Sequence, residues 1–308
     1  MRIAFVFPGQ GSQSVGMLSG FAGNETVAGV MARADEALGF SLTGLIAEGP
    51  AETLSLTVNT QPAMLASSVA FYEAWLAAGG RTPEMMAGHS LGEYSALCAA
   101  GAMSLETAVR LVRFRAEAMQ SAVPVGVGGM AAVIGLADDV EAAVAEARET
   151  GRVEAVNFNA PGQVVIAGEK AAVARAIECA KARGCRRAIE LPVSAPFHSS
   201  LMQPAADKLA ARLAETEIQV PAIPVIANID VEVHETPDAI REALARQAAG
   251  AVQWVRTIER MKAAGITDIV ECGPGKVLTG LLRRTAPEIN GHNIFDAASL
   301  AAVLEKLN

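Results

Sequence analysis

The chain has 308 residues, of which 51% are hydrophobic and 4% aromatic, with a net charge of −8 at pH 7. This length allows one large core with an inserted module, and the negative charge argues against nucleic-acid binding, which needs clustered Lys and Arg. No C-x-x-C spacing, signal-like apolar region or uncharged apolar run of bilayer length is found. We therefore expect a cytoplasmic protein with free thiols and no membrane partner.

The first third of the chain alternates short apolar runs with longer helical patterns. Residues 3–7 are apolar and end at Pro8-Gly9, which is typical of a buried strand. The later elements of this part are predicted, in order, as helices at 26–38 and 61–78, a strand just before residue 88, and helices at 94–100 and 106–120.

Residues 124–192 have a different rhythm, with strand-like and helical patterns in the order β-α-β-β-α-β, which is typical of a ferredoxin-like unit. We therefore predict a small domain at 124–192, inserted into a larger domain made of 1–123 and 193–308. The predicted strands of the small domain are 129–134, 153–157, 163–167 and 187–193, with helices at 138–150 and 170–183.

Strands and helices also alternate in the last third of the chain, which predicts a mostly parallel sheet with helices on both faces. The predicted helices are 200–214, 237–248, 252–264 and 276–284, and the predicted strands are 223–228 and 266–271.

Residues 88–92 read Gly-His-Ser-Leu-Gly, the G-x-S-x-G pattern of a strand-to-helix elbow. A serine hydroxyl reacts when a tight turn exposes it, a base takes its proton, and backbone N–H groups receive the developing oxyanion. Ser90 is therefore a candidate nucleophile. The alternative interpretation is a helix start that Ser90 merely caps.

A nucleophilic serine needs a base, and two histidines are equal candidates on spacing alone. His198 lies in a loop fixed by two prolines and an aromatic residue, just past the predicted domain junction. His292 lies near the end of the chain, where α/β-hydrolases place their histidine, and Asp268 would then be its acid.

Arg115 lies on the apolar face of the predicted helix 106–120, together with Ala108, Leu111, Val112 and Met119. An unpaired guanidinium there would be strongly destabilising, so Arg115 must meet an anion. That anion is either a protein carboxylate or a substrate carboxylate, which a planar guanidinium can bind in a bidentate manner.

The Gly-rich loop after the first strand, residues 7–13, is expected at the ligand crevice of the sheet, where it could present an N–H group to an oxyanion. Its spacing does not match a nucleotide-binding loop, and no His/Cys/Asp/Glu cluster has metal-ligand spacing. We expect neither a metal nor a cofactor.

Several segments together resemble the bacterial malonyl-CoA:acyl-carrier-protein transacylases of type II fatty-acid synthesis. They follow the family's order and span essentially the whole chain: FPGQGSQ at 7–13, TQPA at 60–63, GHSLGEY at 88–94, NFNAPGQVVIAG at 157–168, VSAPFHS at 193–199, QW at 253–254 and GPGKVLTG at 273–280.

The resemblance implies an α/β-hydrolase-like large domain with a ferredoxin-like insertion, and a Ser-His dyad. It implies that Ser90 is the nucleophile, that His198 rather than His292 is the base, and that Arg115 binds the malonyl carboxylate. By the same resemblance, the site residues include the oxyanion-hole residues Gln10 and Leu91, Gln247 for orientation of the histidine, and Phe197 for acyl selectivity.

The implied reaction is ping-pong transfer of malonyl from malonyl-CoA to the phosphopantetheine thiol of an acyl carrier protein, which supplies fatty-acid elongation. Two other classes of function stay open on the residues alone. A serine thioesterase or esterase would release the acyl group to water, and a silent binding module would only hold an acyl group or a carrier protein.

Overall fold

The computed structural model describes residues 1–124, 126–136, 139–193 and 195–308, and within these ranges it forms a mixed α/β protein with two sheets. The larger sheet has the strand order β7-β2-β1-β8-β9, and each neighbouring pair is parallel. Its strands are β1 (Ile3–Phe7), β2 (Met85–Gly88), β7 (Val225–Ile226), β8 (Asp268–Cys272) and β9 (Asn290–Ile294).

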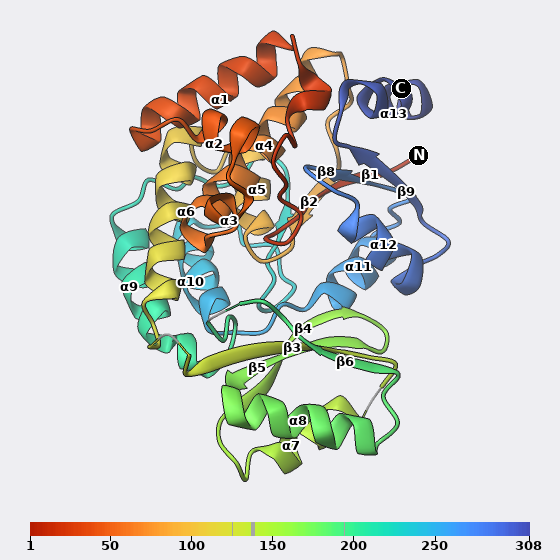
Figure 1. Ribbon diagram of the computed structural model, residues 1–308. Coiled ribbons are helices and arrows are strands. Elements are labelled where there is room, and N and C mark those ends of the chain that lie inside the picture. Colours follow the sequence, from red (N-terminus) through yellow and green to blue (C-terminus); the bar gives the residue numbers. More distant parts are fainter. Residues whose placement is uncertain (125, 137–138, 194) are drawn as a thin grey trace.

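Helices cover both faces of this parallel sheet, as the alternation of elements predicts (Figure 1). Because side chains alternate along a strand, Phe5 and Phe7 of β1 join one hydrophobic cluster, whereas Ala4 and Val6 join the other. The first cluster includes side chains of α1 (Glu25–Leu38), α4 (Thr57–Ala77), α5 (Gly92–Ala99), α6 (Leu105–Gln120) and α13 (Ala297–Leu307), and the second those of α11 (Trp254–Ala263) and α12 (Val277–Thr285).

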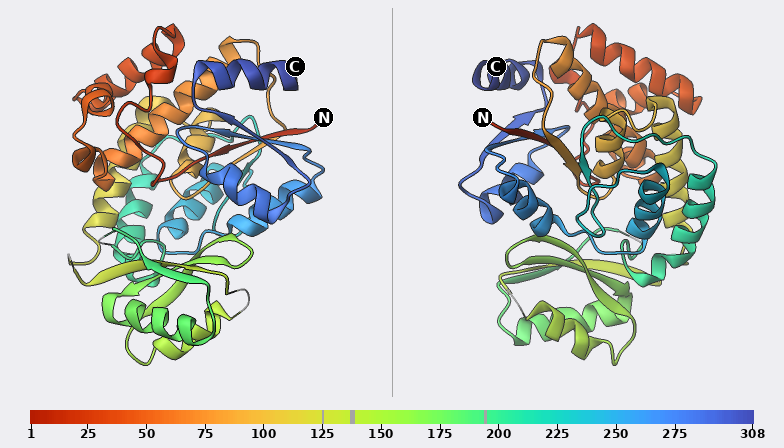
Figure 2. Two further views of the ribbon diagram at one scale, coloured as in Figure 1. Left: turned by 45° about the vertical axis from the view of Figure 1, so that its right-hand side comes forward. Right: turned by 180° about the vertical axis from the view of Figure 1, so that it is seen from behind.

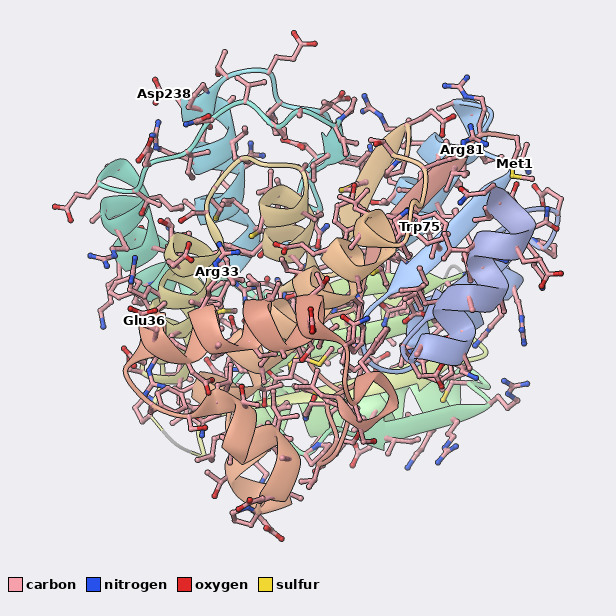
Figure 3. All side chains as sticks on the ribbon, turned by 90° about the horizontal axis from the view of Figure 1, so that it is seen from above. Met1, Arg33, Glu36, Trp75, Arg81 and Asp238 are labelled. Carbon is pink, nitrogen blue, oxygen red and sulfur yellow. The ribbon has the colours of Figure 1, made fainter. Side chains whose placement is uncertain are left out.

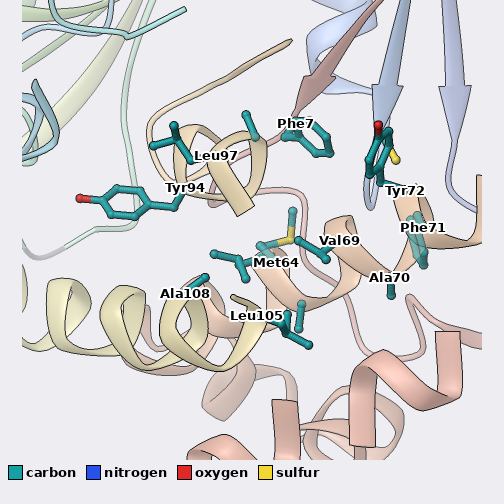
Figure 4. Close-up of a cluster of buried hydrophobic side chains, with 14 of the residues drawn as sticks. Phe7, Met64, Val69, Ala70, Phe71, Tyr72, Tyr94, Leu97, Leu105 and Ala108 are labelled. Atoms are coloured by element: carbon teal, nitrogen blue, oxygen red, sulfur yellow. The ribbon is translucent and has the colours of Figure 1, made fainter. Parts of the chain in front are cut away.

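The first cluster is the main core, and its side chains converge from β1, α4, α5 and α6 (Figure 4). The Tyr72 ring meets the rings of Phe5 and Phe7 edge-on, with centroid separations of 5.4 Å and 6.2 Å. At the end of α4, seen from above in Figure 3, the indole N–H of Trp75 donates to the backbone oxygen of Arg81 at 3.0 Å. These contacts anchor β1 and α4.

The smaller sheet is antiparallel, with the order β4-β5-β3-β6, and forms the end of the molecule opposite to both chain termini (Figure 2). One face packs on α7 and α8, and the other carries Met130, Val156 and Val165 with Phe197 against them. Its elements are β3 (Gly128–Ile134), α7 (Val140–Ala147), β4 (Val153–Ala160), β5 (Gln163–Glu169), α8 (Lys170–Ala182) and β6 (Arg187–Glu190).

The chain returns from the small sheet through α9 (Gln203–Ala214) and α10 (Pro237–Ala248), and the two parts stay connected by backbone hydrogen bonds. Val252 donates to the Val156 oxygen at 2.8 Å and accepts from the Phe158 N–H at 3.0 Å. Along the described ranges, none of the helices combines the length and the apolar character that crossing a bilayer requires. All four cysteines are free thiols.

Some of the predicted bounds of helices and strands are wrong. Helix α4 begins at Thr57 rather than 61, and Pro62 is its sixth residue, so the helix passes through a position that donates no backbone hydrogen bond. Strand β6 ends at Glu190, short of Pro192. The expected start of a helix at Asp138 lies outside the described residues. The sequence patterns missed β9, α13 and the short helices α2 (Leu42–Glu48) and α3 (Ala51–Leu54).

Candidate active site

Ser90 lies at the tip of a tight turn between β2 and α5. Its backbone has a φ of 52°, which is uncommon for a residue with a side chain. A Cβ added to Gly88 would lie 1.8 Å from the carbonyl carbon of Gly92, and one added to Gly92 would lie 2.0 Å from the Phe7 oxygen. Strand, turn and helix therefore approach so closely that only glycine fits at 88 and 92. Ser90 is not a helix cap, because Leu91 holds that position and no side chain caps α5.

The Ser90 hydroxyl contacts His198. The distance between Ser90 Oγ and His198 Nε2 is 2.6 Å, and His198 Nδ1 lies 2.9 Å from the backbone oxygen of Gln247. A carbonyl oxygen can only accept, so Nδ1 carries the hydrogen and Nε2 of the neutral ring accepts from the serine hydroxyl. The pair is thus arranged for transfer of the serine proton to the imidazole.

The alternative base, His292, belongs to a different part of the sheet. His292 Nε2 lies 2.9 Å from Asp268 Oδ1, so the predicted acid–histidine pair does form. However, Asp268 is paired with Ile3 at the start of β1, whereas Gly88 before the elbow is paired with Phe7 at its end. The two sites are separated by about 13 Å along the strand direction. His292 is not in contact with Ser90.

The carbonyl that accepts from His198 belongs to the last turn of α10, where Gln247 is fully buried. The Gln247 oxygen also accepts from the Gly250 N–H at 3.4 Å. Carbonyl groups in the last turn of a helix carry the negative end of the helix dipole. This oxygen can therefore orient the imidazole and favour its protonated form in the way that a carboxylate does in a triad.

Arg115 is buried, with 2% of its surface exposed, and points from α6 toward Ser90. Its Nη2 donates to Ser90 Oγ at 3.2 Å and to Gln247 Oε1 at 2.9 Å, and its Nη1 donates to Gln61 Oε1 at 2.8 Å. Along the described residues, no carboxylate forms a salt bridge with Arg115. Of the two predicted anions, a protein carboxylate is therefore not the direct partner.

Burial dominates the electrostatics of this site. It lowers the pKa of His198 to about 3, with help from the positive charge of Arg115, so the imidazole is neutral at neutral pH. Burial also lowers the pKa of the Arg115 guanidinium. Among the described residues, the site therefore combines a neutral base with a cation whose hydrogen-bond partners are all neutral oxygen atoms.

Ser90 opens into a cavity of about 650 Å³ between the two sheets. Gln10, Leu91, Arg115, Phe197 and His198 all line it, so the predicted site residues other than Gln247 share one cavity with Ser90. In the described part of the chain, the backbone N–H groups of Gln10 and Leu91 donate to no protein acceptor. Both are thus available to an oxyanion. A second cavity of about 500 Å³ shares Gln10 and Phe197 and extends toward α8.

Sequence reasoning missed three buried polar residues around Ser90. Asn228 Oδ1 accepts from the Ser90 N–H and its Nδ2 donates to the Gly88 oxygen, both at 2.7 Å, so this side chain holds the elbow. Gln61 anchors Arg115, and Glu93 accepts from Gln247 at 2.8 Å. Glu93 and Gln61 lie in the matching segments GHSLGEY and TQPA, which was the available signal.

Metal ligands do not gather in this cavity or elsewhere in the described ranges, where no group of three or more His, Cys, Asp or Glu side chains could hold an ion.

The comparisons with known proteins all indicate the same family, and they cover nearly the whole chain. Residues 4–305 match the family model of the acyl transferase domain. The malonyl CoA-acyl carrier protein transacylase of Escherichia coli K12 is 51% identical over 306 residues, or 99% of both chains.

Two solved structures are similar at a TM-score of 0.98. One is the acyl-carrier-protein S-malonyltransferase of Burkholderia pseudomallei 1710b, at 57% identity over 99% of this chain and 100% of that one. The other is a malonyl-transacylase in complex with a type II polyketide acyl-carrier protein, at 47% identity over the same shares. This chain therefore belongs to the acyl transferase family, among its malonyl-CoA:acyl-carrier-protein transacylases.

Proposed function

We propose that this enzyme transfers a malonyl group from malonyl-CoA to the phosphopantetheine thiol of an acyl carrier protein, through a malonyl ester on Ser90. The observation that carries the proposal is the buried Arg115 guanidinium, which lies 3.2 Å from Ser90 Oγ and has only neutral oxygen partners. A substrate that keeps a free carboxylate beside its thioester supplies the missing negative charge. The relatives named for this reaction support the same substrate.

In the first half-reaction the malonyl carboxylate binds Arg115, which places the thioester carbon at Ser90 Oγ. His198 Nε2 takes the hydroxyl proton as Oγ attacks that carbon, and the resulting oxyanion accepts from the N–H groups of Gln10 and Leu91. Removal of one such donor typically raises the barrier by about 3–4 kcal/mol. The C–S bond then breaks, and His198 returns its proton to the CoA thiolate.

The second half-reaction reverses these steps with a different thiol. CoA leaves, the phosphopantetheine thiol of the carrier enters, and His198 takes its proton as the sulfur attacks the malonyl ester. The C–O bond breaks and Ser90 regains its proton from His198. This is ping-pong transfer, in which one base serves two thiols. The Gln247 carbonyl stabilises the imidazolium in each half-reaction.

Phe197 is proposed to restrict the acyl group. Its ring lines the cavity directly before His198 and packs against the apolar face of the small sheet. An α-methyl substituent on the malonyl group would compete for the space that this ring fills. The aromatic residue therefore favours malonyl over methylmalonyl.

The architecture is proposed to consist of an α/β-hydrolase-like domain, residues 1–123 and 193–308, with a ferredoxin-like domain at 124–192. The element order β3-α7-β4-β5-α8-β6 and the sheet order β4-β5-β3-β6 support the ferredoxin-like description. The cavity between the two sheets then gives both thiols a shared route to Ser90. A cytoplasmic location and the absence of a cofactor stay predictions.

Acyl transfer is tested by mixing the protein with malonyl-CoA and then with a phosphopantetheinylated acyl carrier protein. We expect malonyl to appear on the enzyme first and on the carrier second, with little free malonate. Release of malonate at the same rate without a carrier would instead identify a thioesterase.

A further inference from the structure

The proposed reaction steps do not use Glu93, although this residue lies in the first turn of α5, three residues after Ser90. Its side chain is buried, with 2% of the residue exposed. Burial of a carboxyl group costs free energy unless hydrogen bonds compensate for the lost water. The hydrogen-bond partners of the Glu93 carboxyl group therefore indicate its role in the structure.

Both hydrogen bonds of Glu93 go to residues that touch Ser90. Glu93 Oε2 accepts from Gln247 Nε2 at 2.8 Å and from the Asn228 N–H at 2.9 Å. Gln247 Nε2 also donates to the Ser90 carbonyl at 2.9 Å, and Asn228 accepts from the Ser90 N–H. A single carboxyl oxygen thus accepts from the Gln247 side chain and from the Asn228 backbone, and so connects the two residues that hold the elbow.

The contact with Glu93 also helps to set the orientation of the Gln247 amide. Its NH₂ group faces two acceptors, Glu93 and the Ser90 carbonyl, and its oxygen therefore faces Arg115 Nη2 at 2.9 Å. A flipped amide would place NH₂ against a guanidinium that can only donate. Arg115 would then lose one of the neutral oxygens that orient it toward Ser90.

We propose that Glu93 is a positioning residue: its carboxyl group fixes the orientation of the Gln247 amide and thereby directs the Arg115 guanidinium toward the carboxylate of the acyl group. This role rests on the proposed malonyl transfer and extends it to a residue that does not touch the substrate. The contact needs an acceptor oxygen at the Oε2 position.

A matched pair of variants separates the acceptor from the shape of the side chain. Glu93→Gln keeps an acceptor oxygen, whereas Glu93→Met keeps the unbranched shape and removes it. Glu271→Met is the control, because Glu271 is another fully buried carboxyl group but accepts from the N–H groups of Leu278 and Thr279 in α12. For each variant we would measure kcat/KM of enzyme acylation by malonyl-CoA and by acetyl-CoA.

We expect Glu93→Met to lower the malonyl value by about 30-fold, because displacement of a substrate-binding group by a fraction of an ångström is costly. The acetyl value should change by at most about threefold, because acetyl has no carboxylate for Arg115 to bind. Glu93→Gln should retain both values. Glu271→Met should lower the melting temperature while its folded fraction keeps the wild-type ratio of malonyl to acetyl.

An unchanged malonyl-to-acetyl ratio in Glu93→Met would overturn the role of Glu93. If that variant does not fold, Glu93→Asp serves instead, since the shorter side chain withdraws the acceptor from Gln247, and the same fall in the ratio is expected. Wild-type enzyme that fails to form a malonyl adduct would overturn the proposed function itself, so the two failures are distinguishable.

Discussion

Replacement of Arg115 by alanine should remove the advantage that the proposed site gives to a carboxylated acyl group over acetyl. A malonyl carboxylate on the guanidinium forms two charge-assisted hydrogen bonds in a bidentate arrangement, and each contributes about 1.5–3 kcal/mol. The loss of both is therefore about 3–6 kcal/mol, or roughly 150- to 25,000-fold in kcat/KM. Acetyl-CoA has no carboxylate, so its acylation rate should stay within about threefold.

The assay is rapid-quench measurement of acyl-enzyme formation from malonyl-CoA and from acetyl-CoA, with Arg110→Ala as the control. Arg110 lies on the same helix but is exposed, so its removal should leave both rates unchanged. Equal losses for the two acyl groups in Arg115→Ala would refute the reasoning, because they would mean that Arg115 only supports the fold of the site.

Three further predictions concern the base, its titration and the elbow. His198→Ala should abolish malonyl-enzyme formation while His292→Ala leaves it near normal; the reverse result would restore the hydrolase-type triad. Because burial lowers the pKa of His198 to about 3, the neutral base persists well below pH 6.5, so kcat/KM should show no acid limb near that pH; a limb there would contradict this assignment. Gly92→Ala should prevent folding or destabilise the protein by more than about 3 kcal/mol, because the added carbon would lie 2.0 Å from the Phe7 oxygen. Gly29→Ala in α1 has open space and should stabilise by about 0.5–1 kcal/mol in urea unfolding; equal effects at the two glycines would argue against the close approach.

Much of the fold can be predicted from local patterns, because apolar residues recur with a clear helical or strand period in most elements. Residues 3–7 and the helix from 106 to 120 fall within about a residue of their predicted bounds. Strand β9 (Asn290–Ile294) was missed because it is polar along most of its length, at the edge of the sheet. Helix α13 begins at Ala297 and is capped by Asp296, whose side chain accepts from the Ser299 N–H; the apolar pattern does not reveal this capping contact.

Some residues of the candidate site could be predicted from local sequence patterns, and others could not. The helical periodicity alone predicts that the Arg115 side chain points inward. The G-x-S-x-G spacing predicts that Ser90 lies on a strand-to-helix elbow. The positions of His198 and His292 in the sequence could not show which of them is the base for Ser90. That depends on which histidine lies at the end of the sheet that carries Ser90. Asn228 is joined to Ser90 and to Glu93 by hydrogen bonds across more than 130 residues of sequence. Such long-range pairing leaves no local signal at Asn228, whereas Glu93 lies within the matching segment GHSLGEY.

The central claim is that Ser90 carries malonate between two thiols, and intact-protein mass spectrometry after mixing with malonyl-CoA tests it most directly. The account predicts an increase by one malonyl group, located on the peptide that contains Ser90, absent in Ser90→Ala and discharged by a phosphopantetheinylated acyl carrier protein. An unmodified mass for the wild-type protein under rapid quenching, or an adduct that persists in Ser90→Ala, would contradict it.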